Sequence, residues 1–177
     1  MFEGSYPQIT EQVTAISAIL NESLADLRSL SKNLTNPHAQ FTELKDLIDG
    51  ECKRVNRLNV CRVDYVFTDT NFTISATIKN FILRIIQEFI QNSLKHANCT
   101  HVSLDFNHTP EGLDIKANDN GEGFDIESYR DDENKGIGLE NMKKRAELIG
   151  ATFSLDSIIK KGTMLNLFIP ANKLNAS

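Results

Sequence analysis

The sequence has no tryptophan, few other aromatic residues and only three cysteines, and these shortages exclude several classes of protein. Cys52, Cys61 and Cys99 are odd in number and show no CxxC spacing, so they indicate reduced thiols in a cytosolic compartment and not a disulfide scaffold. Only nine glycines and four prolines occur among 177 residues, and 40% of the residues are hydrophobic, which excludes a collagen-like or disordered chain. A chain of this length buries about 70% of its extended surface, so we expect one sizeable core.

Long apolar runs are also missing. Arg84 interrupts the run from Phe81 to Ile86, and no segment approaches the roughly 20 apolar residues that cross a bilayer. Residues 1–7 lack the basic start and the apolar stretch of a signal peptide. We therefore expect a cytoplasmic chain that reaches a membrane only through N-terminal regions missing from it. The net charge of -5 disfavours nucleic acid as a partner.

The N-terminal segment has the pattern of one long amphipathic helix. Its apolar residues recur at steps of four and three, at Ile9, Val13, Ile16, Leu20, Leu24, Leu27, Leu30 and Leu34. Thr35-Asn36-Pro37 ends this helix, because proline removes a backbone donor and restricts the residue before it. We expect the apolar seam to dock on another chain or on a missing upstream helix; packing on its own globular domain is the alternative.

The rest of the chain alternates between helical and strand patterns. The spacing predicts helices over 41–58, 75–97 and 139–149, and strands over 61–67, 101–106, 112–117, 152–157 and 164–169. We accordingly divide the chain into an N-terminal helix over 1–38, a globular domain over 39–172 and a frayed tail over 173–177.

One face of the helix over 75–97 carries polar side chains that suit a metal ion and a phosphate. Glu88, Asn92, Lys95 and His96 recur at helical spacing beside an apolar face. Mg²⁺ takes few protein oxygens and keeps several waters, so a stripe of carboxylate, amide and amine groups suits a hydrated cation and a phosphate. An ordinary solvated helix face is the alternative.

Three further segments combine glycine with polar residues. Asp119-Asn120-Gly121-Glu122-Gly123 follows a strand, where the glycines let backbone approach a ligand, unless the segment is a simple turn. Gly136-Ile137-Gly138 enters a helix beside Lys135, and free N–H groups at a helix start favour an anion. The acidic, aliphatic-poor stretch between these two segments predicts a mobile lid. Gly162-Thr163 opens the last strand, where threonine is otherwise an ordinary strand residue.

The order of these segments resembles the ATP-binding domain of sensor histidine kinases, in the superfamily shared with gyrase, heat-shock chaperone and mismatch-repair ATPases. Glu88-x-x-x-Asn92-x-x-Lys95-His96 is similar to the asparagine box of that family. The segments 119–123 and 136–141 are similar to its two glycine boxes. The sequence around the asparagine box resembles that of the nitrate-sensor and desaturase-regulator subfamily, and the segment Leu24 to Leu34 resembles the second helix of the dimerisation hairpin of that subfamily.

The resemblance implies an α+β fold: a two-layer α/β sandwich of the Bergerat type, with a mixed sheet backed by helices and preceded by a long coiled-coil-like helix. It implies ATP and Mg²⁺ as cofactors. Asp119 would accept a hydrogen bond from the adenine amino group, Gly123 would let the ring approach, and Thr163 would act through water. Asn92 would ligate Mg²⁺ and Glu88 would orient its waters. The remaining nucleotide-binding residues implied are Lys95, His96, Gly121, Lys135, Gly136, Gly138 and Leu139.

One feature departs from the family. The acceptor histidine of this subfamily precedes an acidic residue, whereas His38, His96, His101 and His108 do not. We therefore interpret the chain as a histidine kinase fragment that passes the γ-phosphate of ATP to a histidine on a missing helix, for relay to an aspartate of a response regulator. In the full-length protein we expect a homodimer through the N-terminal helix. The alternatives are a free-standing ATPase or anti-sigma serine kinase, and a non-catalytic nucleotide-binding module.

Overall fold

The computed structural model describes residues 42–69, 72–126 and 137–175. The long helix predicted before Pro37 and the boundary near residue 38 lie outside these residues. The same holds for Lys135, Gly136 and most of the predicted lid.

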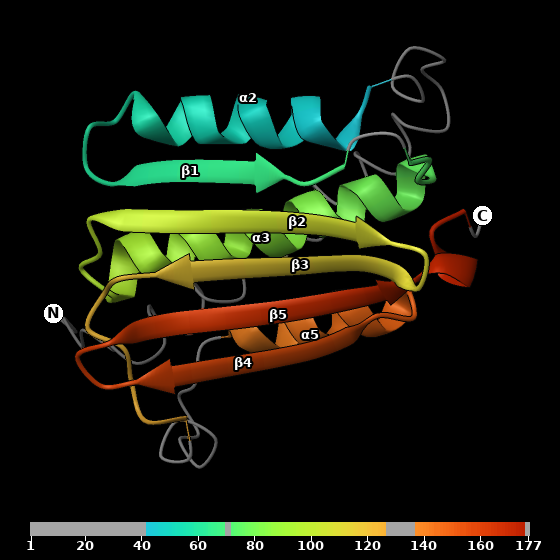
Figure 1. The fold of residues 1–177 in the computed structure, drawn as a ribbon. Helices are drawn as coiled ribbons and strands as arrows, with labels where there is room; N and C mark the ends of the chain where they lie inside the picture. The colour runs from blue at the N-terminus through green and yellow to red at the C-terminus, as the bar shows by residue number, and fades with distance from the viewer. Residues whose placement is uncertain (1–41, 70–71, 127–136, 176–177) are drawn as a thin grey trace, which may run out of the picture. The chain divides into compact units, whose positions relative to one another are not determined.

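The described residues form a five-stranded mixed sheet with the strand order β1-β2-β3-β5-β4 (Figure 1). β1 (Arg62–Phe67) pairs in parallel with β2 (His101–Thr109), and every other pairing is antiparallel. β3 (Gly112–Asp119), β4 (Thr152–Ile158) and β5 (Gly162–Pro170) complete the sheet. The predicted mixed sheet is confirmed.

Helices cover one face of this sheet. α3 (Ala76–His96) and α5 (Ile137–Leu148) lie behind the strands in Figure 1, and α2 (Leu44–Asn56) runs beside β1. Side chains alternate along the strands, and in β2, β3 and β5 one side is buried against the helices. The core includes Ile82, Ile85 and Ile86 of α3 together with Val102, Leu104, Phe106, Leu113, Ile115, Leu165 and Leu167 of the strands. This arrangement confirms the predicted two-layer α+β sandwich.

α3 is fixed at its first turn as well as by its apolar side. The Ser75 hydroxyl caps it by accepting a hydrogen bond from the Ile78 N–H. The Ser75 N–H donates to the carbonyl of Leu174 at 2.9 Å, and Leu174 is 3% exposed. Ala171–Lys173 form a 3₁₀ helix that leads to this contact. The prediction of a frayed tail from residue 173 was therefore wrong for Lys173 and Leu174, because a buried leucine anchors the segment.

The turns that position the other elements follow from residues with positive φ. Gly150, with φ of 66°, ends α5 in the left-handed conformation that glycine adopts without strain. The two strands of the β2–β3 hairpin extend further than predicted, with Thr109 opposite Gly112. Asp119 is consequently the last residue of β3 and not a loop residue.

A buried carboxylate links α2 to α3. Glu51 is 6% exposed and accepts hydrogen bonds from Arg54 at 2.5 and 3.0 Å and from the amide of Gln87 at 3.1 Å. Burial by itself raises the pKa of Glu51, but these hydrogen bonds outweigh burial and leave the pKa below its usual value. Glu51 is therefore held ionised between the two helices. None of the helices among the described residues is both long and apolar enough to cross a membrane.

Candidate functional site

A cavity of about 270 Å³ opens between α3, the end of β3, the start of α5 and the β4–β5 hairpin. Several of the predicted nucleotide-binding residues line it: Asn92, His96, Asp119, Gly123, Gly138, Leu139 and Thr163. The remaining lining residues are Phe89, Ser93, Ala97, Phe124, Met142 and Leu155. The segments predicted to act together thus meet around one cavity, although they are spread over more than seventy residues of sequence.

Asp119 is the most constrained polar group of this cavity. It is 7% exposed, and its Oδ1 accepts the N–H of Gly121 at 2.8 Å and the N–H of Thr163 at 3.3 Å. Its Oδ2 accepts the hydroxyl of Ser93 at 2.9 Å. A carboxylate has about four lone-pair positions, so these donors fix its orientation and leave acceptor capacity toward the cavity.

Two glycines bring the loop after β3 against the β4–β5 hairpin. Gly162 has φ of 89°, and a Cβ there would overlap the carbonyl oxygen of Asp119. Gly123 has φ of 59°, and a Cβ there would overlap the carbonyl oxygen of Ile158. Both positions require a left-handed backbone and a close approach of two backbone segments of the chain. These glycines therefore shape the cavity wall by packing protein against protein, in addition to the approach of a ligand expected at Gly123.

The loop after β3 also packs on the end of α3. The N–H of Glu122 donates to the carbonyl of Ala97 at 2.8 Å. A Cβ at Gly121 would lie within 2.9 Å of the Asp119 Oδ1 and would overlap Ala97. Gly121 is thus a packing position behind the cavity and is not among its lining residues.

Gly138 brings the start of α5 against the polar stripe of α3. A Cβ at this position would overlap the Glu88 carboxylate and would lie 3.2 Å from Nδ2 of Asn92. The first turn of a helix presents unpaired N–H groups and the positive end of the helix dipole. The cavity therefore offers an anion-favouring helix start beside an amide and a carboxylate.

The two basic residues of the stripe differ in position. His96 is exposed and lines the cavity. Lys95 is exposed as well, but it is not among the lining residues.

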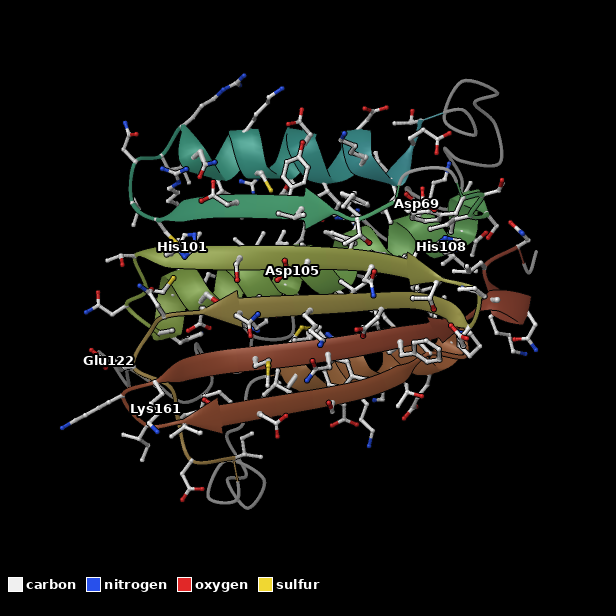
Figure 2. The ribbon with its side chains drawn as sticks, viewed as in Figure 1. Asp69, His101, Asp105, His108, Glu122 and Lys161 are labelled. Atoms are coloured by element: carbon white, nitrogen blue, oxygen red, sulfur yellow. The ribbon has the colours of Figure 1, made fainter. Side chains whose placement is uncertain are left out.

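Ser157 connects the loop after β3 to the hairpin. Its hydroxyl accepts the N–H of Phe124 at 2.9 Å and lies 3.1 Å from the hydroxyl of Thr163. The N–H of Lys160 donates to the carbonyl of Glu122 at 2.5 Å. Figure 2 shows Glu122 and Lys161 at the same end of the sheet, where β3 ends and β5 begins. This end of the sheet is therefore braced by hydrogen bonds between segments that are distant in sequence.

Several lining residues were not predicted from the sequence. Phe89, Met142 and Leu155 were not among the predicted site residues, and they supply apolar walls of the cavity. Ser93 directly follows Asn92 and lies four residues after Phe89, which is the spacing of one helix face. That spacing was the only signal that could have placed Ser93 between the core and the polar stripe.

Residues 77–173 match the family of histidine kinase-, DNA gyrase B-, and HSP90-like ATPases. The chain belongs to this family. It is 29% identical over 171 residues to the sensor protein VraS of Staphylococcus aureus, a match that covers 94% of this chain and 47% of VraS. VraS of Staphylococcus epidermidis matches to the same extent. The chain thus spans about half the length of these relatives.

Solved structures of histidine kinases share the fold of this chain. The histidine kinase AdeS of Acinetobacter baumannii superposes with a TM-score of 0.64 at 16% identity, over 97% of this chain and 87% of AdeS. The ATP binding domain of PrrB from Mycobacterium tuberculosis gives 0.59 at 24% identity, over 73% of this chain and 94% of PrrB. The family match and the similarity to VraS, together with this shared fold, identify the chain as a homologue of sensor histidine kinases that carries their ATP-binding domain. The finer likeness to the nitrate-sensor and desaturase-regulator subfamily stays a prediction.

Proposed function

We propose that this chain is the ATP-binding catalytic part of a sensor histidine kinase in a two-component system. It would hold Mg²⁺-ATP and direct the γ-phosphate to a histidine on a helix outside the domain, for relay to a response-regulator aspartate. The observation that carries the proposal is the buried carboxylate of Asp119, fixed by donors from α3, its own loop and β5 at the wall of the cavity. The family match and the VraS relatives support it.

The adenine end of the proposed site lies around Asp119. Its free acceptor capacity suits the 6-amino group of adenine, which can only donate. Phe89, Met142 and Leu155 suit the faces of a flat ring, since ligand cavities combine apolar walls with a few fixed polar groups. Thr163 would add a hydroxyl on the same side, and Gly123 would leave room for the ring.

The phosphate end would lie where α3 meets α5. The first turn of α5 at Gly138 and Leu139 would offer N–H groups to phosphate oxygens, with His96 at the edge. Bound Mg²⁺ would neutralise phosphate charge. The Asn92 amide oxygen would hold the ion and the Glu88 carboxylate would orient its waters, a donor set that fits a cation which keeps several waters. Lys95, Lys135 and Gly136 remain proposed contributors on sequence grounds.

Phosphoryl transfer depends on positioning and charge stabilisation more than on covalent chemistry by the protein. The residues around the cavity are of the kinds needed to hold the donor, whereas none of the four histidines precedes an acidic residue. We therefore place the acceptor on a separate helix, paired with the segment 9–34 in a homodimer. A response regulator is the proposed downstream partner, and membrane attachment would come from other regions of the full-length protein.

Calorimetric titration with ATP, with and without Mg²⁺, tests the nucleotide site. We expect binding that weakens when the metal is chelated and a further loss in Asn92→Ala. Transfer is tested by mixing the chain with a helix that bears a histidine followed by an acidic residue. Acid-labile label should then form on the added helix and not on His38, His96, His101 or His108. Wild-type protein that binds no nucleotide would overturn the proposal.

A further inference from the structure

We propose that Ser93 is a positioning residue for adenine recognition: its hydroxyl holds the Asp119 carboxylate in the orientation that receives the 6-amino group. The inference rests on the proposed function, and it assigns a specific task to a residue at an unspecified position of the asparagine box. Ser93 is 2% exposed and lies on α3, next in sequence to Asn92.

The direction of the Ser93 hydroxyl proton determines which group the side chain holds. Two acceptors lie within reach of its Oγ: the carbonyl of Phe89 at 3.0 Å and the Asp119 Oδ2 at 2.9 Å. A hydroxyl has only one proton to donate. The Phe89 carbonyl already receives the backbone N–H four residues later in the helix, whereas hydrogen bonds to an ionised carboxylate are the stronger kind. The proton therefore points to Asp119.

The hydrogen bond from Ser93 reaches a different oxygen of Asp119 from the other donors. The N–H groups of Gly121 and Thr163 both reach Oδ1. Ser93 is the donor that the structure gives to Oδ2, and it comes from α3 on the other side of the carboxylate. The two N–H donors hold Oδ1 from the loop and from β5, and the Ser93 hydroxyl holds Oδ2 from α3, so together they resist rotation of the carboxylate about its Cβ–Cγ bond. Ser93 thereby fixes the direction of the acceptor lone pairs that face the cavity.

The test compares two nucleotides that differ only in the group Asp119 would recognise. ATP carries the 6-amino group, and purine riboside triphosphate has hydrogen in its place. Ser93→Ala removes the hydroxyl without adding bulk at a buried position. We expect its affinity for ATP to fall about ten-fold, as for loss of one charge-assisted hydrogen bond, while its affinity for purine riboside triphosphate changes less than about two-fold. Ser93→Cys, a weaker donor of similar size, should fall between Ser93→Ala and wild type.

A matched control and a fold measurement separate the possible outcomes. Ser103→Ala, on the opposite face of β2 from the buried Val102 and Leu104, should leave both affinities unchanged. Thermal unfolding monitored by circular dichroism reports whether each variant is folded. If Ser93→Ala is not folded, the two nucleotide affinities are compared between Ser93→Cys and wild type. An equal loss for both nucleotides, or no loss for either, would overturn the assignment of Ser93 while leaving nucleotide binding intact. Wild-type protein that binds neither nucleotide would instead overturn the proposed function, and this inference with it.

Discussion

The substitution Asp119→Asn separates adenine recognition from folding. The side-chain amide of the new asparagine finds hydrogen-bond partners within the protein for all of its groups except one N–H. The amide oxygen can take the place of Oδ1 and keep the N–H groups of Gly121 and Thr163. The amide nitrogen then takes the place of Oδ2, and the Ser93 hydroxyl can accept from it and turn its own proton to Phe89, whose carbonyl is 3.0 Å away. The remaining N–H faces the cavity, where the proposed ligand also presents a donor.

The magnitude follows from these exchanges. The backbone partners of residue 119 survive, so we expect the free energy of unfolding to change by only about 1 kcal/mol. ATP, in contrast, loses a hydrogen bond to an ionised acceptor, worth about 1.5–3 kcal/mol, and meets an opposing donor in a buried position. A loss of about 3 kcal/mol corresponds to an affinity lower by about 100-fold, and even the smaller value gives more than ten-fold.

Isothermal titration with Mg²⁺-ATP and urea denaturation measure the two quantities on the same samples. Asp105→Asn is the matched control, since Asp105 is an exposed aspartate of β2 on the open face of the sheet (Figure 2). It should change neither quantity appreciably. An Asp119→Asn protein that is folded and binds ATP within two-fold of wild type would refute the assignment of adenine to this carboxylate.

Gly162→Ala should lower both the melting temperature and the affinity for ATP, because the φ of 89° and the close carbonyl at the end of β3 leave no room for a Cβ. Gly50→Ala is the control: a Cβ there has no atom within 4 Å, so thermal unfolding should show a melting temperature that is unchanged or slightly higher. Glu51 has a pKa below its usual value of 4.5 in the folded protein, so urea denaturation should show stability present above pH 4.5 and lost as the pH falls below it, with a shallower loss in Glu51→Gln. Burial raises the pKa of Cys52 and of Cys99 to about 12, so both thiols should resist an aromatic disulfide reagent at pH 8 until urea is added. Because the pKa of a cysteine is about 9 in the unfolded chain, the contribution of these thiols to stability should be lost as the pH rises from about 9 toward 12.

The elements of the fold could be predicted because their periodicity reflects local physics. Strand alternation and helical periodicity placed every described strand and α-helix within a few residues of its observed bounds. The C-terminal segment was not predictable in this way. A single buried leucine at 174 and one backbone hydrogen bond to Ser75 fix it, and neither produces a repeating pattern.

Some residues of the candidate site could be predicted from the sequence, and others depend on contacts that only the tertiary fold creates. Residue types with distinctive chemistry, such as Asp119 and Asn92, stood out in the sequence and line the cavity. Ser93 and Ser157 did not stand out, because a serine in a helix or a strand is common and its role depends on which groups the tertiary fold brings within 3 Å. The glycines were noticed, but the atoms that forbid a side chain at Gly123 and Gly162 belong to segments more than thirty residues away in sequence.

The position of Ser93 next to Asn92 gives α3 a role at both ends of the proposed site. Successive residues of an α-helix point about 100° apart, so one helix presents Asn92 toward the start of α5 and Ser93 toward the end of β3. Ile82, Ile85 and Ile86 bury the earlier turns of the same helix in the core, and Ser75 ties its first turn to Leu174. A displacement of α3 along its axis would therefore move the metal-side amide and the donor to the adenine-side carboxylate together. The distance between the two ends of the nucleotide would accordingly be set by one rigid element, and the packing of the core would maintain it.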